Sequence, residues 1–192
     1  MKAIKHSQSL SYVVVITGKH GRVIKRIEAQ SRSFVEQWNK LVNVQAKQTA
    51  STITDTEGTA RSISPDQAAF ELMAGAGLTT YGIRIGKGST AVAIDDYALE
   101  TPIAHGVGAN QLDHLAMIKT PPSVVGSTCS FTIKRNMINK SGATVSGVRE
   151  LGAYMRLNTS YYGLGFRDVL GSSCDVPDGG AVTVEYTIKV TV

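Results

Sequence analysis

The chain has 192 residues, 42% of them hydrophobic, a net charge of +5 and two cysteines. A chain of this length can bury a core without the help of disulfides or metal ions. Cys129 and Cys174 match no metal-ligand spacing, so we expect two free thiols beside strands and synthesis in a reducing compartment. No stretch approaches the roughly 20 apolar residues of a membrane span, and no apolar signal core follows residues 1–6, which predicts a soluble, non-secreted protein without a membrane partner.

Positive charge is concentrated in the first quarter of the chain. Residues 1–50 hold nine lysines and arginines against two glutamates, a balance of +7, which leaves −2 for residues 51–192. Nucleic-acid binders usually interleave aromatic side chains with such charges, and this segment has only Tyr12, Phe34 and Trp38. We favour a solvated basic face or a contact with an acidic neighbouring subunit, and contact with nucleic acid stays open as the alternative.

The first elements predicted are a hairpin and a helix. Two β-branched runs, 11–17 and 22–28, are joined by a turn with glycine at each end, the pattern of two paired strands. Ser33 and Glu36 then have the spacing of a capping box, in which each side chain satisfies a free backbone donor. Apolar residues continue at helical spacing and predict one amphipathic N-terminal helix lying on a sheet, with the stripe Phe34, Val35, Trp38, Leu41, Val42 and Gln45.

The next segment is polar and β-branched. Residues 49–64 predict two short strands around a turn at Glu57 and Gly58, and their low apolar content indicates an exposed arm. Residues 67–73 predict a short helix, and a domain boundary could fall in this region.

The rest of the chain alternates strands and turns. The clearest strand is 181–192, which alternates apolar and polar residues after a Pro-Asp-Gly-Gly turn at 177–180. Further strands are predicted at 81–85, 111–118, 127–137, 145–157 and 161–170.

Because no long helix separates these strands, we predict a mainly β fold, an antiparallel β-sandwich of jelly-roll or immunoglobulin-like type. Residues 1–192 would form a single domain. Residues 1–64 supply its hairpin, helix and exposed arm, and residues 81–192 supply the main sandwich.

The turn Gly86-Lys87-Gly88-Ser89-Thr90 superficially resembles a phosphate-binding loop. A Walker loop places its lysine directly after the second glycine and continues into a helix. Here the lysine precedes Gly88, and strand-like residues follow the turn. We therefore interpret it as an ordinary glycine-rich turn that leaves a strand.

Other polar residues also lack the pattern of a catalytic or metal site. Adjacent Asp95 and Asp96 are better explained as helix-capping residues than as cation ligands. His105 and His114 could form an acid–base pair, but no nucleophile motif accompanies them, and Ser172 and Ser173 lie in a turn. We expect no catalytic, cofactor-binding or metal-binding residues, no cofactor and no enzymatic activity, although paired carboxylates for glycoside hydrolysis would leave no sequence signature.

Glu150 is a charged residue predicted to lie on the inward face of a strand. A buried carboxylate needs a cation, and Arg135 or Arg167 could supply it.

Turns and strands across most of the chain resemble small virion structural proteins of tailed bacteriophages. The N-terminal hairpin, the helix and residues 53–62 share this resemblance. The other segments that carry it, in the same order, are 81–90, 95–103, 131–135, 139–142, 148–152, 166–170 and 176–180.

The resemblance implies a non-enzymatic particle component, namely a collar, head–tail junction, tail or capsid-decoration subunit. Its implied location is the virion after synthesis in the host cytoplasm. Its implied partners are copies of itself and other virion proteins, such as major capsid, portal or tail proteins. Repeated weak contacts stabilise such assemblies. Residues 49–64 and the loop 103–111 are the candidates for these contacts, and the alternative is that both are surface loops without a partner.

A carbohydrate- or host-receptor-binding adhesin module is the alternative function. Sandwich folds often present binding sites on their end loops, and glycan sites favour exposed aromatic residues. Tyr161 and Tyr162 are the only adjacent aromatic pair in the chain. They are therefore the residues on which this alternative depends.

Overall fold

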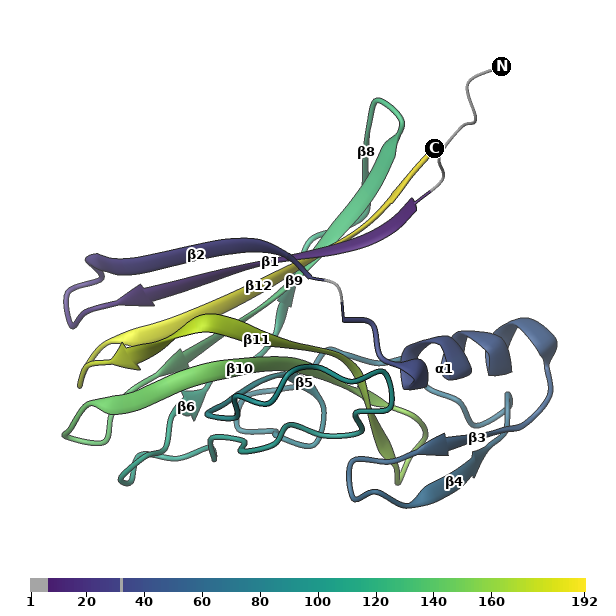
Figure 1. The fold of residues 1–192 in the computed structure, drawn as a ribbon, viewed down its shortest axis with the longest axis horizontal. Helices are drawn as coiled ribbons and strands as arrows, with labels where there is room; N and C mark the ends of the chain where they lie inside the picture. The colour runs from purple at the N-terminus through teal and green to yellow at the C-terminus, as the bar shows by residue number, and fades with distance from the viewer. Residues whose placement is uncertain (1–6, 32) are drawn as a thin grey trace.

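The computed structural model describes residues 7–31 and 33–192. The fold is mainly β, and its sheets are antiparallel (Figure 1). Residues 1–6 and 32, which belong to the basic segment, lie outside the described residues. Within the described ranges, no helix has the length and apolar character that crossing a bilayer requires.

Among the described residues, the larger sheet has seven strands in the order β2-β1-β12-β9-β6, with β7 and β8 also paired to β9. These strands are β1 (Ser7–Thr17), β2 (Val23–Ser31), β6 (Asp113–His114), β7 (Ile118–Lys119), β8 (Ser123–Val125), β9 (Thr128–Ile138) and β12 (Ala181–Thr191). Pairing of β1 with β12 runs from Ser7 opposite Thr191 to Thr17 opposite Ala181. The predicted terminal strand is therefore confirmed, and it lies between two long neighbours.

The second sheet has the order β11-β10-β5, and a separate hairpin joins β3 to β4. These elements are β3 (Ser51–Thr54), β4 (Ala60–Ile63), β5 (Gly82–Gly86), β10 (Val145–Arg156), β11 (Tyr162–Val176) and the helix α1 (Glu36–Lys47). In Figure 1 the two larger sheets lie one above the other, with α1 and the β3–β4 hairpin at one end.

The core lies between the two larger sheets. Val182, Val184 and Tyr186 of β12 are fully buried, and the Tyr186 ring meets the Phe166 ring of β11 edge-on, 4.6 Å between centroids. One cluster of buried apolar residues includes members of both sheets, of α1 and of the β3–β4 hairpin. Trp38 belongs to it with 5% exposure, which confirms its predicted place on the buried stripe of the helix.

The predicted start of the helix is wrong. The helix begins at Glu36 after an N-cap at Val35 that makes no side-chain capping bond. It spans Glu36–Lys47, after the predicted hairpin, and is therefore not an N-terminal helix. Ser33 donates its hydroxyl proton to Asp168 of β11, so a long-range carboxylate has replaced the capping bond. The buried face is also rotated: Val42 is 45% exposed, whereas Val44 is buried.

The segment 49–64 forms the predicted pair of strands, but its inner face is not exposed. Ile53 and Ile63 are fully buried, and the Thr54 amide donates to the Gln37 side chain of α1 at 3.3 Å. Alternate residues of the hairpin are polar and lie outside, which is why its composition indicated an arm. The two isoleucines nevertheless fix it to the core.

The predicted short helix at 67–73 is also wrong, because the backbone of this segment is hydrogen-bonded to the end of β10. The Ala69 amide donates to the Leu157 carbonyl and the Arg156 amide donates to the Glu71 carbonyl, both at 2.9 Å. The Arg156 guanidinium also pairs with the Glu71 carboxylate at 3.1 Å. Backbone groups that a helix would have used are thus bonded to a neighbouring strand.

Strand boundaries differ from the prediction in two further places. Between 111 and 118 only Asp113 and His114 and then Ile118 are in strands, and the short strand β8 was not predicted. Strand β11 continues to Val176 through Ser172 and Ser173, which the sequence placed in a turn.

Candidate functional site

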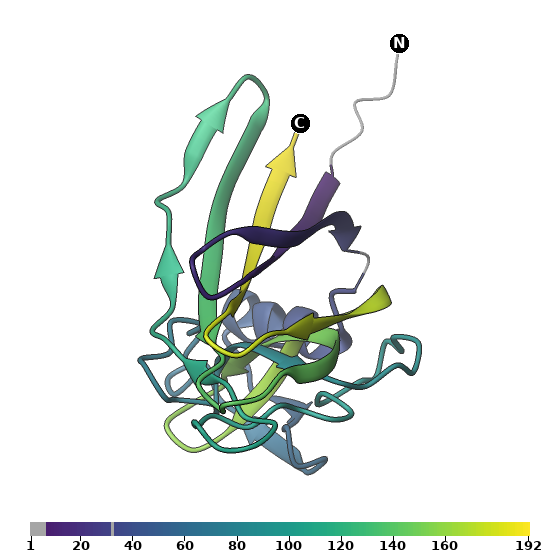
Figure 2. The same cartoon turned by 90° about the vertical axis from the view of Figure 1, so that its left-hand side faces the viewer.

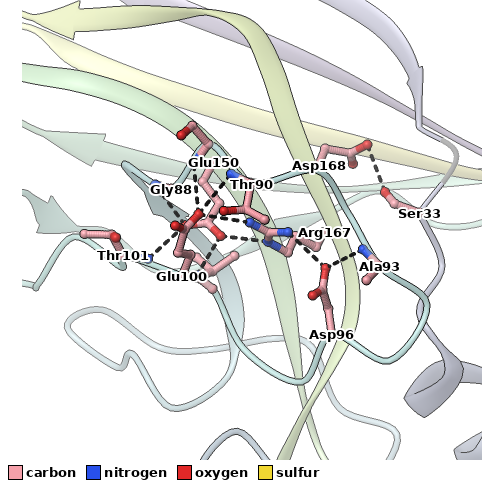
Figure 3. Close-up of polar contacts among 12 residues, drawn as sticks. Ser33, Gly88, Thr90, Ala93, Asp96, Glu100, Thr101, Glu150, Arg167 and Asp168 are labelled. Atoms are coloured by element: carbon pink, nitrogen blue, oxygen red, sulfur yellow. Dashed lines mark hydrogen bonds and ion pairs between the residues drawn. The ribbon is translucent and has the colours of Figure 1, made fainter.

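A buried arginine organises the outer face of the sheet β11-β10-β5. Arg167 donates from Nε to Glu150 Oε1 at 2.7 Å and from Nη1 to Asp96 Oδ2 at 2.9 Å, and its Nη2 lies 3.7 Å from Glu100 Oε2. Figure 3 shows the three carboxylates around this guanidinium, two of them brought by the loop 87–101. The side chains of Arg167 and Glu150 are 3% and 0% exposed, so this pair is shielded from solvent, whereas the Glu100 side chain is 44% exposed.

The same carboxylates bind the backbone of the glycine-rich turn. Glu150 accepts hydrogen bonds from the amides of Gly88, Glu100 and Thr101 at 3.3, 2.7 and 3.2 Å. The Glu100 carboxylate accepts from the amides of Ser89 and Thr90 at 2.9 and 3.0 Å, and the Thr90 amide is the main cause that lowers the pKa of Glu100. The amide groups of this turn therefore bind carboxylates, and these carboxylates belong to Glu100 and Glu150 of the protein itself.

The predicted ion pair between Glu150 and Arg167 is confirmed. Arg135 lies in the other sheet, where it donates to four backbone carbonyl groups. The interpretation of Asp95 and Asp96 as helix caps is wrong, because no helix follows them; Asp96 accepts from the Ala93 amide at 3.0 Å as well as from Arg167. The Asp96 side chain is held by Arg167, a cation 71 positions away in the sequence.

Close packing at Gly86 gives a direct test of this arrangement. A Cβ atom there would lie 2.6 Å from the Thr101 carbonyl oxygen and would also collide with Glu150 Oε2. We expect Gly86→Ala to lower the free energy of unfolding by about 1–3 kcal/mol, because the loop must move off the sheet. Urea denaturation measures this change.

Gly171→Ala is the matched control, since a Cβ atom at Gly171 would meet no atom within 4 Å. Its effect is expected to stay within about 0.5 kcal/mol. Equal effects of the two substitutions would show that the loop does not depend on its contact with Glu150.

A second polar group lies on the inner face of β11. Asp168 accepts hydrogen bonds from the Ser33 hydroxyl at 2.9 Å and from the Tyr186 hydroxyl at 3.1 Å. Burial raises the pKa of Asp168 to about 6. Asp168 and Ser33 also line a cavity of about 620 Å³ beneath Val92 and Ile94. The serine thus donates to a carboxyl group, an arrangement that orders both side chains.

The two histidines singled out in the sequence lie together. The His114 amide donates to His105 Nδ1 at 3.1 Å, and the two ring centroids are 5.8 Å apart. His114 is fully buried, and burial lowers its pKa to about 3, so its ring stays neutral near pH 7. Within the described ranges, no three His, Cys, Asp or Glu side chains gather as metal ligands would, and both cysteines are free thiols.

Tyr161 and Tyr162 line a cavity of about 380 Å³ together with residues of the β3–β4 hairpin. The Tyr162 ring stacks on the Tyr81 ring at 6.0 Å, and the Arg61 guanidinium lies over the Tyr161 ring at 4.3 Å. Thr56 at the hairpin tip donates its amide proton to the Tyr162 carbonyl at 2.9 Å. The sequence pointed to the tyrosine pair and to the hairpin separately, and did not predict that they share a cavity.

An apolar row that the described residues leave exposed lies where the long strands extend beyond the second sheet. The β8–β9 hairpin, the end of β12 and the start of β1 project together from the rest of the molecule (Figures 1 and 2). Val190 of β12 pairs with Cys129 of β9, which pairs with Val124 of β8, so the three side chains share one face. Val190 and Val124 are 50% and 71% exposed, although Val182, Val184 and Tyr186 on the same face of β12 are fully buried.

No protein-family model, curated protein or solved structure matches this chain. Its function is therefore proposed from the contacts and exposed surfaces described above.

Proposed function

We propose that this chain is a non-enzymatic structural subunit of a tailed-bacteriophage virion, a β-sandwich that assembles through repeated contacts between copies. The main support is the apolar row Val190, Cys129 and Val124, which continues the buried face of β12 beyond the sheet that covers it. A second copy that covered this row would bury it as Val184 and Tyr186 are buried. The resemblance of the turn and strand pattern to small virion proteins also supports the proposal.

Open strand edges provide a second means of association. Strand β2 stands at one edge of the larger sheet, and the short strands β6, β7 and β8 stand along the other. Edge strands present backbone groups that can pair with another chain. We propose that such edges, together with the loop 103–111, meet neighbouring copies or other virion proteins of the capsid, portal or tail.

The basic N-terminal segment has several of its charges engaged within the fold. Lys25 donates to Ser172 and Ser173, Arg26 pairs with Glu28, and Lys40 pairs with Glu36. Contact of this segment with nucleic acid remains a proposal, and these internal partners favour the alternative of a solvated face or a protein contact.

The oligomeric state in solution tests the proposed role of the apolar row. Light scattering after size exclusion is expected to give a mass above the 20.4 kDa of one chain for the wild type. Val190→Asp is expected to return the protein to 20.4 kDa, because a charge in a covered apolar contact is costly. Lys189→Asp, on the opposite face of β12, is the control and should leave the oligomer intact.

A wild-type protein of 20.4 kDa at every concentration would rule out self-assembly through this row. The position in a virion is tested separately, by searching purified particles for peptides of this chain with mass spectrometry and by locating the subunit with electron microscopy. Absence of the chain from particles of the phage that encodes it would refute the virion role.

A saccharide-binding module is the second candidate function, favoured by the cavity at Tyr161 and Tyr162. Aromatic rings and hydroxyl groups line this cavity, a combination that suits sugar rings. A glycan array should then show saturable binding that is lost in the double variant Tyr161→Ala, Tyr162→Ala. An array without any bound glycan would remove this candidate.

A further inference from the structure

Arg84 is a buried cation whose hydrogen bonds are incomplete. The residue is 8% exposed, and it donates from Nη1 to the Thr79 carbonyl and from Nη2 to the Ile103 carbonyl, the latter at 3.2 Å. Its Nε is buried and has no partner among the described residues. None of the ion pairs found in the described residues includes Arg84.

A buried guanidinium without a counter-charge is unfavourable, and burial accordingly lowers the pKa of Arg84. The other two buried arginines have more partners, although Arg167 Nη2 also makes no hydrogen bond among the described residues. Arg167 has three carboxylates around it, and Arg135 donates to four carbonyl groups deep in the core. Arg84 differs from both because it has two neutral acceptors and forms part of a cavity wall.

The acidic residues of that cavity are already committed to another cation. Asp55 accepts from Arg61 Nε at 2.6 Å and from the amides of Glu57 and Thr59 at 3.0 and 2.8 Å. Glu57 lies 3.8 Å from Arg61 Nη2, and its side chain is 81% exposed. The charge of Arg84 therefore has no protein carboxylate in the cavity to balance it.

Hydroxyl and aromatic groups form much of the remaining wall. Three residues with hydroxyl groups, Thr79, Thr80 and Ser160, line the cavity, together with three tyrosines, Tyr154, Tyr161 and Tyr162. A volume of about 380 Å³ is near the lower end of the range for small-ligand sites, roughly 300–1,000 Å³. These dimensions suit a single sugar unit.

We propose that this cavity binds an acidic saccharide, with the sugar carboxylate at Arg84 and the ring hydroxyls at Thr79, Thr80 and Ser160. This inference rests on the second candidate function and specifies its ligand class. An arginine can meet a carboxylate through two parallel hydrogen bonds, which gives the acid an advantage that no neutral sugar shares.

The ligands themselves provide the first test, since they require no change in the protein. Methyl β-glucuronide, its methyl ester and methyl β-glucoside differ only at the carboxyl position. Titrations of the full chain followed by NMR are expected to show the acid binding at least about tenfold more tightly than the ester or the glucoside. Resonances of Tyr161, Tyr162 and Arg84 should shift during the titration.

Each other outcome overturns a defined part of the inference. Equal binding of all three sugars would reject the preference for an acid and leave the saccharide function standing. Binding of none, on the array or in the titration, would reject both. Acetate that competes as well as the sugar acid would show a site for any carboxylate and would reject the saccharide.

Arg84→Gln tests the residue, because it keeps hydrogen-bonding capacity and removes the charge. It is expected to abolish the tenfold preference, so that the acid binds no more tightly than the glucoside. Lys87→Gln, a nearby cation bonded to Asn110 outside this cavity, is the control and should keep the preference. Thr80→Val, a smaller change in the cavity wall, should weaken all three sugars, so the site stays testable if Arg84→Gln does not fold.

Discussion

Replacing Arg167 by methionine is expected to lower the free energy of unfolding by about 3–5 kcal/mol. The change leaves Glu150 buried without the cation that lies 2.7 Å from it, and it releases Asp96 of the covering loop. Urea denaturation followed by Trp38 fluorescence measures the loss. Hydrogen exchange should also become faster at the amides of Gly88, Glu100 and Thr101, which bond to Glu150.

Two further variants show whether the loss of stability comes from breaking the buried ion pair or from removing any arginine. Arg26→Met removes an exposed pair with Glu28 and should change stability by about 0.5 kcal/mol or less. Adding Glu150→Gln to Arg167→Met should restore part of the loss, because it removes the unpaired charge. An Arg167→Met protein within about 1 kcal/mol of the wild type would show that the network contributes little.

Opposite pH dependences are expected from His114 and Asp168. The pKa of His114 is lowered from 6.5 to about 3, so below pH 6.5 the unfolded chain binds a proton that the folded chain does not. Its contribution to stability is therefore lost as the pH falls, by about 1.4 kcal/mol per pH unit. The pKa of Asp168 is raised from 3.8 to about 6, so between those values the folded chain binds the extra proton and stability rises as the pH falls.

The two slopes nearly cancel in the wild type, and single variants should reveal them. Between pH 6.5 and 4.5, Asp168→Asn should lose about 2–3 kcal/mol of stability, whereas His114→Gln should gain about 2 kcal/mol between pH 6 and 4.5. Urea denaturation at several pH values gives both profiles. Variants that follow the wild-type profile would show that neither group titrates as its burial implies.

Between pH 6.5 and 4.5 the stability contributed by two other carboxyl groups, Glu36 and Asp113, is retained. A hydrogen bond from Lys40 lowers the pKa of Glu36, and one from Lys140 lowers the pKa of Asp113. Stability from these two groups is lost only as the pH falls below their ordinary values of 4.5 and 3.8.

The strands could be predicted because alternation is a local property of the sequence. Residues 181–192 alternate along their length, and one buried face followed in the structure. The start of the helix could not be predicted in the same way, because Ser33 bonds to Asp168, 135 positions further along the chain. Local preference lost to a distant carboxylate there, as it did for residues 67–73 beside β10.

The candidate sites could be predicted only where a charged residue expected to be buried needed a partner of opposite charge. Glu150, as a carboxylate predicted to be buried, required a cation, and Arg167 was one of two candidates in the sequence. The predicted inward face is wrong, because Glu150 lies on the outer face of its sheet, where the loop 87–101 covers it. The cavity at Arg84 had no such signal, since Asp55, Arg84 and Tyr161 come from three separate parts of the chain. The cluster at Asp168 likewise joins Ser33, Asp168 and Tyr186.

The pairing of Ser7 with Thr191 has a practical consequence for experiments with this protein. An affinity tag or fluorescent fusion at the C-terminus would emerge next to Val190. It would shield the apolar row sterically and make an assembling subunit look monomeric. A small label is better placed at Gly171 of β11, where a Cβ atom would meet nothing within 4 Å.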